Sequence, residues 1–346
     1  MNQNPEKALE LAYHVHAKSR ARFGLPSNPP HHPGGLKCGA CANNCIISRG
    51  SMGFCGLVKN TDNRLKRFGG TKEKGVLDWY YDDLPTNCVS WWFCPGCTGN
   101  GYPFYAHKSH AEYGYVNLAV FYGACSYDCL YCQNWRYRSM SVKQKPVLSA
   151  EELSEKVNEQ VSCVCFFGGD PSPQMMHSLE TTRIAVECAK AKNQILRVCW
   201  ETNGYMNPSL AGRAAEYALE TGGLIKFDLK AWSDVLNIAL CGVSNKPTLK
   251  NFRFIGENFY KQRPNLPVLT ASTLLIPGYV DVEEVERITY FISTIDPDIP
   301  YTLLAFHPCY VLDDLPTTSR DQAMRCKKIA ETHLQHTRIG NKHLLS

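Results

Sequence analysis

The sequence predicts an α/β protein in which an open, partial (β/α)6 barrel follows a cysteine-rich, irregular N-terminal extension. Its 346 residues suffice for about two domains, and 44% hydrophobic with 20% charged residues exclude wholesale disorder. From residue 116 onward, short apolar runs alternate with longer amphipathic segments, the pattern of a parallel sheet covered by helices. We count about six such units, fewer than the eight of a closed barrel, and therefore favour an open barrel over a flat doubly wound sheet.

The apolar runs predict strands at 116–122, 162–167, 195–200, 224–229, 267–275 and 301–306. Helices are expected near 150–160, 173–192, 208–221, 248–262, 282–294 and 319–336. Helix-start signals support three of them: Ser149 with Glu152 as a capping box, Asn207 before Pro208, and Thr318 three residues before Asp321. In such a fold, functional side chains gather on the loops that follow the carboxyl ends of the strands.

Three regions are expected along the chain. Residues 1–115 form the N-terminal extension, 116–310 the barrel, and 311–346 a C-terminal helix that packs on the barrel. The extension is rich in glycine, proline and cysteine and shows little hydrophobic periodicity. Such a segment cannot bury a large core alone, so we expect metal binding to hold its loops.

Charge and hydropathy exclude several classes of partner. The net charge of +5 is too small to predict nucleic-acid binding. No apolar run approaches the roughly 18 residues of a membrane span, and the polar N-terminus lacks the apolar core of a secretory signal. We therefore expect a cytoplasmic protein with neither a nucleic-acid nor a membrane partner.

Cysteine is the compositional outlier, with 17 residues, and in a reducing cytosol clustered thiols are more often metal ligands than disulfides. Seven candidate metal ligands lie in the extension: Cys38, Cys41, Cys45 and Cys55 in a C-x2-C-x3-C-x9-C pattern, then Cys88, Cys94 and Cys97. They could hold structural zinc or a second iron–sulfur cluster, in one site with spare thiols or in two sites. Four others, Cys163, Cys165, Cys188 and Cys199, are interpreted as small buried hydrophobic residues, and Cys309 as an outlying thiol that could face the active site.

The first predicted strand runs into a loop with Cys125, Cys129 and Cys132 at C-x3-C-x2-C spacing. A four-iron cluster usually takes four thiolates, so three would leave one iron open to a substrate or cofactor. The alternatives are a zinc site that borrows a fourth ligand, or buried thiols without a metal.

This loop resembles the signature of the radical S-adenosylmethionine (SAM) superfamily, with Tyr131 at the aromatic position before the last cysteine. The resemblance implies a [4Fe-4S] cluster whose open iron is chelated by the amino and carboxylate groups of SAM. One electron from the reduced cluster would then cleave SAM to methionine and a 5′-deoxyadenosyl radical, which abstracts a hydrogen atom.

Further strand ends resemble elements of the glycyl-radical-enzyme activating enzymes, such as the activator of pyruvate formate-lyase. Gly168-Gly169-Asp170 is similar to the Gly-Gly-Glu element that holds the SAM amino group, although Asp replaces Glu. Glu201-Thr202-Asn203 and Asp228-Leu-Lys230 resemble the Asp-Thr-Asn and Asp-Leu-Lys elements. The resemblance implies a monovalent cation near Glu201, Thr202 and Asp228, the SAM carboxylate near Lys230, and the SAM ribose near His307.

The resulting hypothesis is a radical SAM enzyme that abstracts hydrogen from a protein or peptide, either as an activating enzyme or in another post-translational modification. About 40 residues follow the sixth predicted strand, too few for a large C-terminal cluster domain, and an open barrel can admit a polypeptide loop. A reducing partner such as flavodoxin or ferredoxin is implied. The alternatives are a cobalamin-dependent radical SAM C-methyltransferase, although no D-x-H-x-x-G signature occurs, and a non-catalytic zinc-knuckle binding protein.

Overall fold

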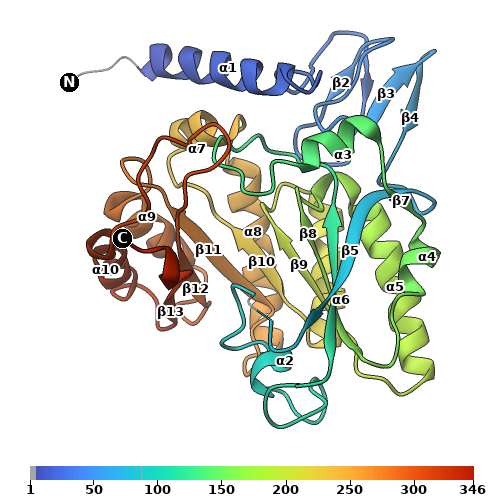
Figure 1. The fold of residues 1–346 in the computed structure, drawn as a ribbon, viewed down its shortest axis with the longest axis vertical. Helices are drawn as coiled ribbons and strands as arrows, with labels where there is room; N and C mark the ends of the chain where they lie inside the picture. The colour runs from blue at the N-terminus through green and yellow to red at the C-terminus, as the bar shows by residue number, and fades with distance from the viewer. Residues whose placement is uncertain (1–4, 87) are drawn as a thin grey trace.

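The computed structural model describes residues 5–86 and 88–346. Its centre is a nine-stranded sheet in the order β13-β12-β11-β10-β9-β8-β6-β5-β7 (Figure 1). The strands from β6 to β13 in this order pair in parallel, whereas β5 pairs antiparallel with both β6 and β7. The two edge strands, β13 and β7, do not pair with each other, so the sheet is open, as predicted.

All six predicted strands are confirmed: β6 (Val116–Tyr122), β8 (Val161–Gly168), β9 (Arg197–Thr202), β10 (Ile225–Asp228), β11 (Leu269–Leu275) and β12 (Tyr301–Ala305). Three more strands join them: β5 (Gly75–Asp83), β7 (Val147–Leu148) and β13 (Thr337–Gly340). Strand β5 comes from the segment expected to be an irregular extension. Its valine, tryptophan and tyrosines fit a half-buried strand. Pairing with β6 stabilises this strand, which the local sequence pattern did not predict.

Helices cover the outer face of the sheet (Figure 1). They are α4 (Ala150–Ser154), α5 (Met175–Ala191), α6 (Pro208–Thr221), α8 (Lys246–Phe259), α9 (Val282–Ser293) and α10 (Arg320–Ala330), and the short 3-10 turns are η1 (Ser172–Gln174), η2 (Tyr260–Gln262) and η3 (Lys342–Leu344). The expected Ser149–Glu152 capping box and the Asn207 cap are present. The prediction for the last helix is wrong at both ends: Ser319 rather than Thr318 is the N-cap, and the helix stops at Ala330 because β13 follows.

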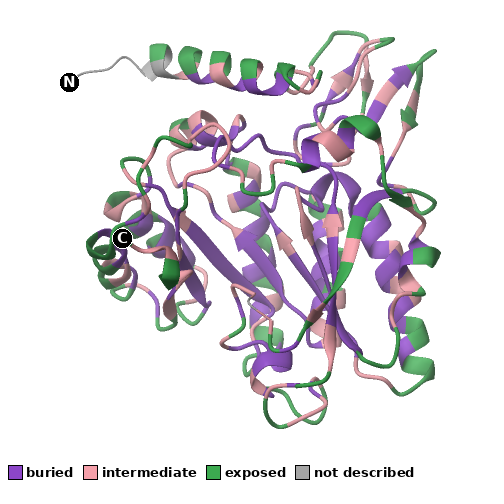
Figure 2. Cartoon of the chain, in the orientation of Figure 1, coloured by how far each residue is buried: buried purple, intermediate pink, exposed green. Residues whose placement is uncertain are grey.

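The main core lies between this helical layer and the sheet. Figure 2 shows the parallel strands mostly buried, β5 partly exposed, and exposed residues on the outer surfaces of the helices. Trp200 and Phe166, both fully buried, are among the largest side chains of this core, and their rings lie 5.5 Å apart. Because the outer face of the sheet carries the hydrophobic core, the opposite face is free to carry polar and sulfur-containing side chains.

The segments outside the barrel lie at both ends of the sheet (Figure 1). At the carboxyl ends of the parallel strands are α1 (Pro5–Ala21), the small hairpins β1 (Leu36–Lys37) with β2 (Ile46–Ile47) and β3 (Val58–Thr61) with β4 (Arg64–Arg67), α3 (Tyr137–Lys143) and α7 (Asp234–Cys241). At the opposite end lies α2 (Pro95–Thr98). Within the described residues, no helix combines the length and hydropathy needed to cross a membrane.

Candidate active site

A cavity of about 330 Å³ lies at the carboxyl ends of the parallel strands, and we call it the carboxyl-end cavity. It is bordered by every barrel residue that the sequence singled out for cluster or cofactor binding except His307. These residues are Cys125, Cys129, Tyr131, Cys132, Gly168, Gly169, Asp170, Glu201, Thr202, Asn203, Asp228 and Lys230. Segments that are far apart in the sequence meet here because the parallel strands end at one edge of the sheet.

The three-cysteine loop, residues 123–136, follows β6 and presents its thiols to this cavity. The Cys125 Sγ accepts hydrogen bonds from the Tyr127 amide at 3.3 Å and from Asn203 Nδ2 at 3.7 Å. Burial raises the pKa of Cys125, and it raises that of Cys132 to about 11. Of the described residues, no group of three or more Cys, His, Asp or Glu side chains has the geometry to hold a single metal ion. Thiols that bind separate irons of one cluster need no such close grouping.

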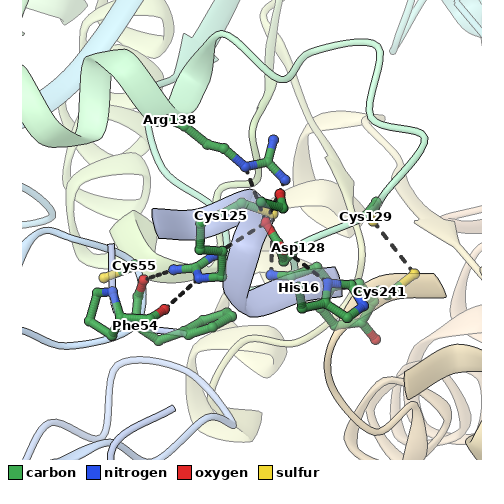
Figure 3. Close-up of polar contacts among 12 residues, drawn as sticks. His16, Phe54, Cys55, Cys125, Asp128, Cys129, Arg138 and Cys241 are labelled. Atoms are coloured by element: carbon green, nitrogen blue, oxygen red, sulfur yellow. Dashed lines mark hydrogen bonds and ion pairs between the residues drawn. The ribbon is translucent and has the colours of Figure 1, made fainter. Parts of the chain in front are cut away.

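The sequence analysis missed a role for Cys241. Its thiol, at the end of α7, lies 3.5 Å from the Cys129 Sγ, and the hydrogen bond between the two sulfurs lowers the pKa of Cys129 (Figure 3). It also lies 3.5 Å from the Tyr131 hydroxyl. Cys241 does not border the carboxyl-end cavity, so it supports Cys129 from behind, and the cysteines on the cavity wall are the three of the loop.

A buried ion network fixes the centre of this loop (Figure 3). The Asp128 carboxylate accepts hydrogen bonds from Arg138 Nη2 at 2.6 Å and His16 Nδ1 at 2.9 Å, and Arg20 Nη1 lies at 3.4 Å. Burial alone would raise the pKa of Asp128, but the His16 hydrogen bond and the two arginine charges lower it to about 2. His16 and Arg20 belong to α1, so the N-terminal helix helps to hold the cysteine loop in place.

The turn after β8 requires glycine. At Gly168, whose φ is +112°, an added Cβ would lie 2.4 Å from the Tyr122 amide nitrogen. At Gly169, an added Cβ would lie 2.4 Å from the Ala124 carbonyl oxygen. The two glycines therefore bring the backbone of this turn against β6 and the start of the cysteine loop.

The Asp170 carboxylate is already occupied by protein donors. Its oxygens accept hydrogen bonds from Ser172 N at 2.7 Å, Asn203 N at 2.8 Å and Thr202 Oγ1 at 2.9 Å. Burial raises its pKa in spite of these donors. With both oxygens engaged, Asp170 joins the ends of β8 and β9 and has less capacity to hold a ligand ammonium than the sequence comparison implied.

Glu201 also has a protein partner that the sequence did not predict. Lys226 Nζ lies 2.7 Å from Glu201 Oε1, and its charge lowers the pKa of Glu201 against the opposing effect of burial. Lys226 on β10 and Glu201 on β9 are paired residues of neighbouring parallel strands. Their contact follows from the register of the two strands, which no local motif reveals.

Asp228 retains a free acceptor. One of its oxygens pairs with Lys230, whereas Oδ1 is buried without a hydrogen-bond partner. An unpartnered buried carboxylate oxygen is costly unless a ligand or cation satisfies it. Of the three groups expected around a cation, Asp228 is the one whose buried oxygen lacks a protein donor.

Two expected residues lie elsewhere. His307 is exposed and does not border the cavity, and Cys309 donates to the Cys132 carbonyl at 3.7 Å from outside the cavity. Conversely, the wall includes residues to which no role was assigned: Val89, Gln133, Asn134, Tyr137, Phe167, Lys226, Ser272, Leu274, Leu304 and Asn341. Asn341 follows β13, which explains why it was missed along with that strand.

The seven cysteines of the extension divide into two groups. Cys38, Cys41, Cys45 and Cys55 line one small cavity, and we call them the four-thiol knot. The knot lies beside the cysteine loop, since Asn43 Nδ2 donates to the Ser126 carbonyl at 2.8 Å. The other three are Cys88, Cys94 and Cys97, in and before α2. Helix α2 lies at the opposite end of the sheet (Figure 1), and the Cys88 thiol lies 2.9 Å from Lys226 Nζ.

The side chains that line the carboxyl-end cavity fit a cluster held by three thiolates, with a polar ligand beside it. Three thiols can serve as cluster ligands. The glycine turn allows the backbone to come close to a bound ligand, and Asp228 and Lys230 provide one negative and one positive charge to contact it. A residue set of this kind can hold a redox cluster and position an amino acid group beside it.

Comparison with known proteins gives a consistent result. The model of the Radical SAM superfamily matches residues 119–291. A Methanocaldococcus jannaschii protein provisionally named a glycyl-radical enzyme activating enzyme is 28% identical over 217 residues, covering 61% of this chain and 76% of that protein. An uncharacterized protein of the same organism is 24% identical over 323 residues, 88% of this chain and 81% of that protein. A solved domain of a pyruvate-formate lyase-activating enzyme from Bacteroides vulgatus is 21% identical, with a TM-score of 0.40 over 51% of this chain and 98% of that chain.

Proposed function

Because the chain belongs to the radical SAM superfamily, a family of enzymes that use SAM and a [4Fe-4S] cluster, we propose that it abstracts a hydrogen atom from a protein or peptide substrate. The cluster would be held by Cys125, Cys129 and Cys132, and when bound and reduced it supplies the electron that cleaves SAM. The observation that carries the proposal is that three thiols border the carboxyl-end cavity, whereas Cys241 and Cys309, which contact the loop, do not. This arrangement leaves one corner of a cluster free for SAM.

The residues of the chain have distinct tasks in this proposal. The backbone at Gly168 and Gly169 approaches the ligand closely and offers carbonyl oxygens to its ammonium group. Lys230 faces the carboxylate, and Asp228, through its unpartnered Oδ1, completes the polar wall. Asp170 acts as a positioning residue, because its oxygens hold Ser172, Thr202 and Asn203 and not the ligand.

Asp228 is the best-supported contact for a monovalent cation. Its Oδ1 is buried and unpartnered, whereas Glu201 is neutralised by Lys226. Thr202 donates its hydroxyl proton to Asp170 and accepts a hydrogen bond from the Gly204 amide at 3.0 Å, which leaves one of its two lone pairs for a cation. The cation therefore remains part of the proposal with Asp228 and Thr202 as its side-chain contacts and without Glu201.

A protein or peptide substrate is supported by the relative named for activating a glycyl-radical enzyme. The carboxyl-end cavity, at about 330 Å³, falls at the lower end of small-ligand sites, so a polypeptide would present only one residue to it. Flavodoxin or ferredoxin remains the proposed reductant. Cobalamin-dependent C-methylation of a protein residue remains the second candidate, whereas the match to an enzyme family disfavours a non-catalytic zinc-knuckle protein.

The four-thiol knot is proposed to bind a metal that stabilises the N-terminal segment. Burial raises the pKa of Cys45 to about 11 and that of Cys55 to about 12, so these thiols would stay protonated without a cation. Binding of zinc or of iron would supply the charge that favours the thiolates. Thiolates are ligands of both metals, but zinc would need the four sulfurs to move together around one ion, because no three described ligands are placed to share one.

The test of the proposed function is SAM cleavage by the anaerobically purified, reduced protein. We expect 5′-deoxyadenosine to form with wild type and not with the triple variant Cys125→Ala, Cys129→Ala, Cys132→Ala. SAM should also change the electron paramagnetic resonance spectrum of the reduced wild-type cluster. A protein that holds about four irons in the loop yet shows neither response would contradict the proposal. A cobalamin absorption spectrum after reconstitution would identify the methyltransferase alternative.

A further inference from the structure

A second cavity, of about 280 Å³, lies inside the sheet towards the amino ends of the parallel strands, and its walls are rich in thiols. Five cysteines border it: Cys88, Cys94, Cys163, Cys165 and Cys199. A sixth, Cys97, belongs to the same cluster of packed side chains. We call these six residues the barrel thiols, and they are distinct from both the cysteine loop and the four-thiol knot.

The barrel thiols come from three separate parts of the chain. Cys163 and Cys165 are two residues apart on β8, so both point to the same face of the sheet. Cys199 on β9 is the register partner of Cys165. The pair Cys94 and Cys97 is carried by α2, which lies across the amino end of the sheet (Figure 1). Cysteines from the sheet and from α2 therefore surround one space.

Cys163, Cys165 and Cys199 are buried, as predicted, whereas Cys188 is exposed and that part of the prediction is wrong. The three buried thiols nevertheless border a cavity, so packing alone does not account for them. Protein cores pack to near-crystalline density and leave few voids larger than a water molecule. Here the thiols border an open space of about 280 Å³ and do not fill it. A ligand that binds sulfur accounts for both the space and the choice of residue.

A buried cation points at two of these sulfurs. Lys226 Nζ donates to the Cys88 Sγ at 2.9 Å and to the Cys165 Sγ at 3.5 Å. An ammonium group stabilises a thiolate much more than a neutral thiol. Lys226 and its partner Glu201 border both cavities, so this ion pair forms the partition between the barrel thiols and the carboxyl-end cavity.

A second buried ion pair packs against α2. Arg197 Nη2 lies 2.7 Å from Glu112 Oε2, and both side chains are almost wholly buried. A Cβ added at Gly96, between Cys94 and Cys97, would lie 2.8 Å from Arg197 Nη2. The helix that carries the C-x2-C pair is therefore held against the sheet by contacts independent of the cysteines.

From this arrangement we infer that the barrel thiols hold an auxiliary [4Fe-4S] cluster, with Cys94 and the strand cysteines Cys163, Cys165 and Cys199, all of which border the cavity, as its ligands. Among the described residues, no three potential ligands have the geometry for one shared metal ion, whereas a cubane distributes four thiolates over four irons. Cys97, which packs in the same cluster of side chains, and Cys88, which Lys226 contacts, would lie beside the iron–sulfur cluster. The inference does not depend on SAM cleavage, since these residues belong to another cavity.

The test counts iron and sulfide in the full chain after anaerobic reconstitution. Cys125, Cys129 and Cys132 are first replaced by alanine, so that iron of the loop cluster is removed. Adding Cys94→Ala with Cys97→Ala should remove a further four irons and four sulfides, about one cubane. Adding Cys188→Ala, an exposed cysteine on α5, should remove none.

A separate pair of variants guards against misfolding. Cys163→Ser with Cys199→Ser keeps side-chain volume and should give the same loss, while circular dichroism and the thermal midpoint report whether the fold persists. Unchanged iron and sulfide in either folded double variant would overturn the inference, as would zinc in place of iron. The same double substitutions are also made in the chain with an intact cysteine loop. Normal SAM cleavage there, with the auxiliary iron absent, would leave the proposed function intact, so the two proposals fail separately.

Discussion

Asp128 Oδ1 lies 2.6 Å from Arg138 Nη2, and both side chains are completely buried beside the three-cysteine loop. The same carboxylate binds His16 and contacts Arg20 from α1. One carboxylate thus balances two buried guanidinium groups and joins three chain segments. Its cost of desolvation is offset only while all these partners remain in place.

The first prediction concerns this network. We expect Asp128→Asn to lower the free energy of unfolding by about 3–5 kcal/mol, because Arg20 and Arg138 would stay buried without a counter-charge. Urea unfolding of the metal-free protein measures the effect. The matched control is Asp62→Asn, which breaks the exposed pair with Arg49 and should cost less than about 0.5 kcal/mol. Equal effects of the two substitutions would contradict the assigned role of Asp128.

The second prediction concerns the glycine turn after β8. We expect Gly168→Ala to weaken SAM binding by at least about tenfold, because the new methyl group would displace β6 or the turn. Gly278→Ala is the control, since φ is +78° there but no atom lies within 4 Å of the added Cβ. Both variants carry left-handed backbone strain, and only Gly168→Ala should change the dissociation constant measured by calorimetry.

The third prediction concerns Asn203, whose amide lies 3.7 Å from the Cys125 sulfur. Hydrogen bonds to ligand sulfur raise the reduction potential of a cluster. We therefore expect Asn203→Asp, which lacks the donor and adds negative charge, to lower the potential by on the order of tens of millivolts. Asn134→Ala serves as control, because its amide donates to the Gly168 carbonyl and not to sulfur. An unchanged potential in Asn203→Asp would exclude this role.

The fourth prediction is a pH dependence of stability that arises from His177 on α5. Burial lowers its pKa from 6.5 to about 4, and it binds the Tyr122 hydroxyl and the Leu148 carbonyl. Since the folded state holds the proton less tightly than the unfolded state, stability is complete above pH 6.5 and decreases as the pH falls towards 4. Between pH 6.5 and pH 4 the free energy of unfolding of the wild-type protein should fall by about 3 kcal/mol more than that of His177→Gln. If the free energies of unfolding of the two proteins, measured in urea, decreased equally across this pH range, His177 would be ruled out as the titrating group.

Local sequence patterns predicted much of the barrel. The six apolar runs became strands because each is buried on both faces, and Ser149 and Asn207 cap their helices through contacts with residues two or three positions away. The three cysteines, the glycine pair and the acids at the strand ends could be placed together because a parallel sheet brings its carboxyl ends to one edge.

What the sequence did not reveal depends on long-range contacts. Nothing near Asp128 indicates that its partners lie 112 and 108 residues earlier, at His16 and Arg20. The Lys226–Glu201 pair follows from the register of β9 and β10, and Cys241 reaches Cys129 through the packing of α7. Strands β5 and β13 were missed because each depends on its neighbour in the sheet for its hydrogen bonds.

The position of α1 has a consequence for how the metal centre is assembled. His16 and Arg20 close over the outer side of the cysteine loop, and the helix packs on α7 behind it. Once this helix has docked, the side of the loop away from it still faces the carboxyl-end cavity, which SAM must also enter. Cluster assembly and SAM binding would then use the same cavity. Assembly before α1 docks would give iron and sulfide a second approach to the cysteine loop.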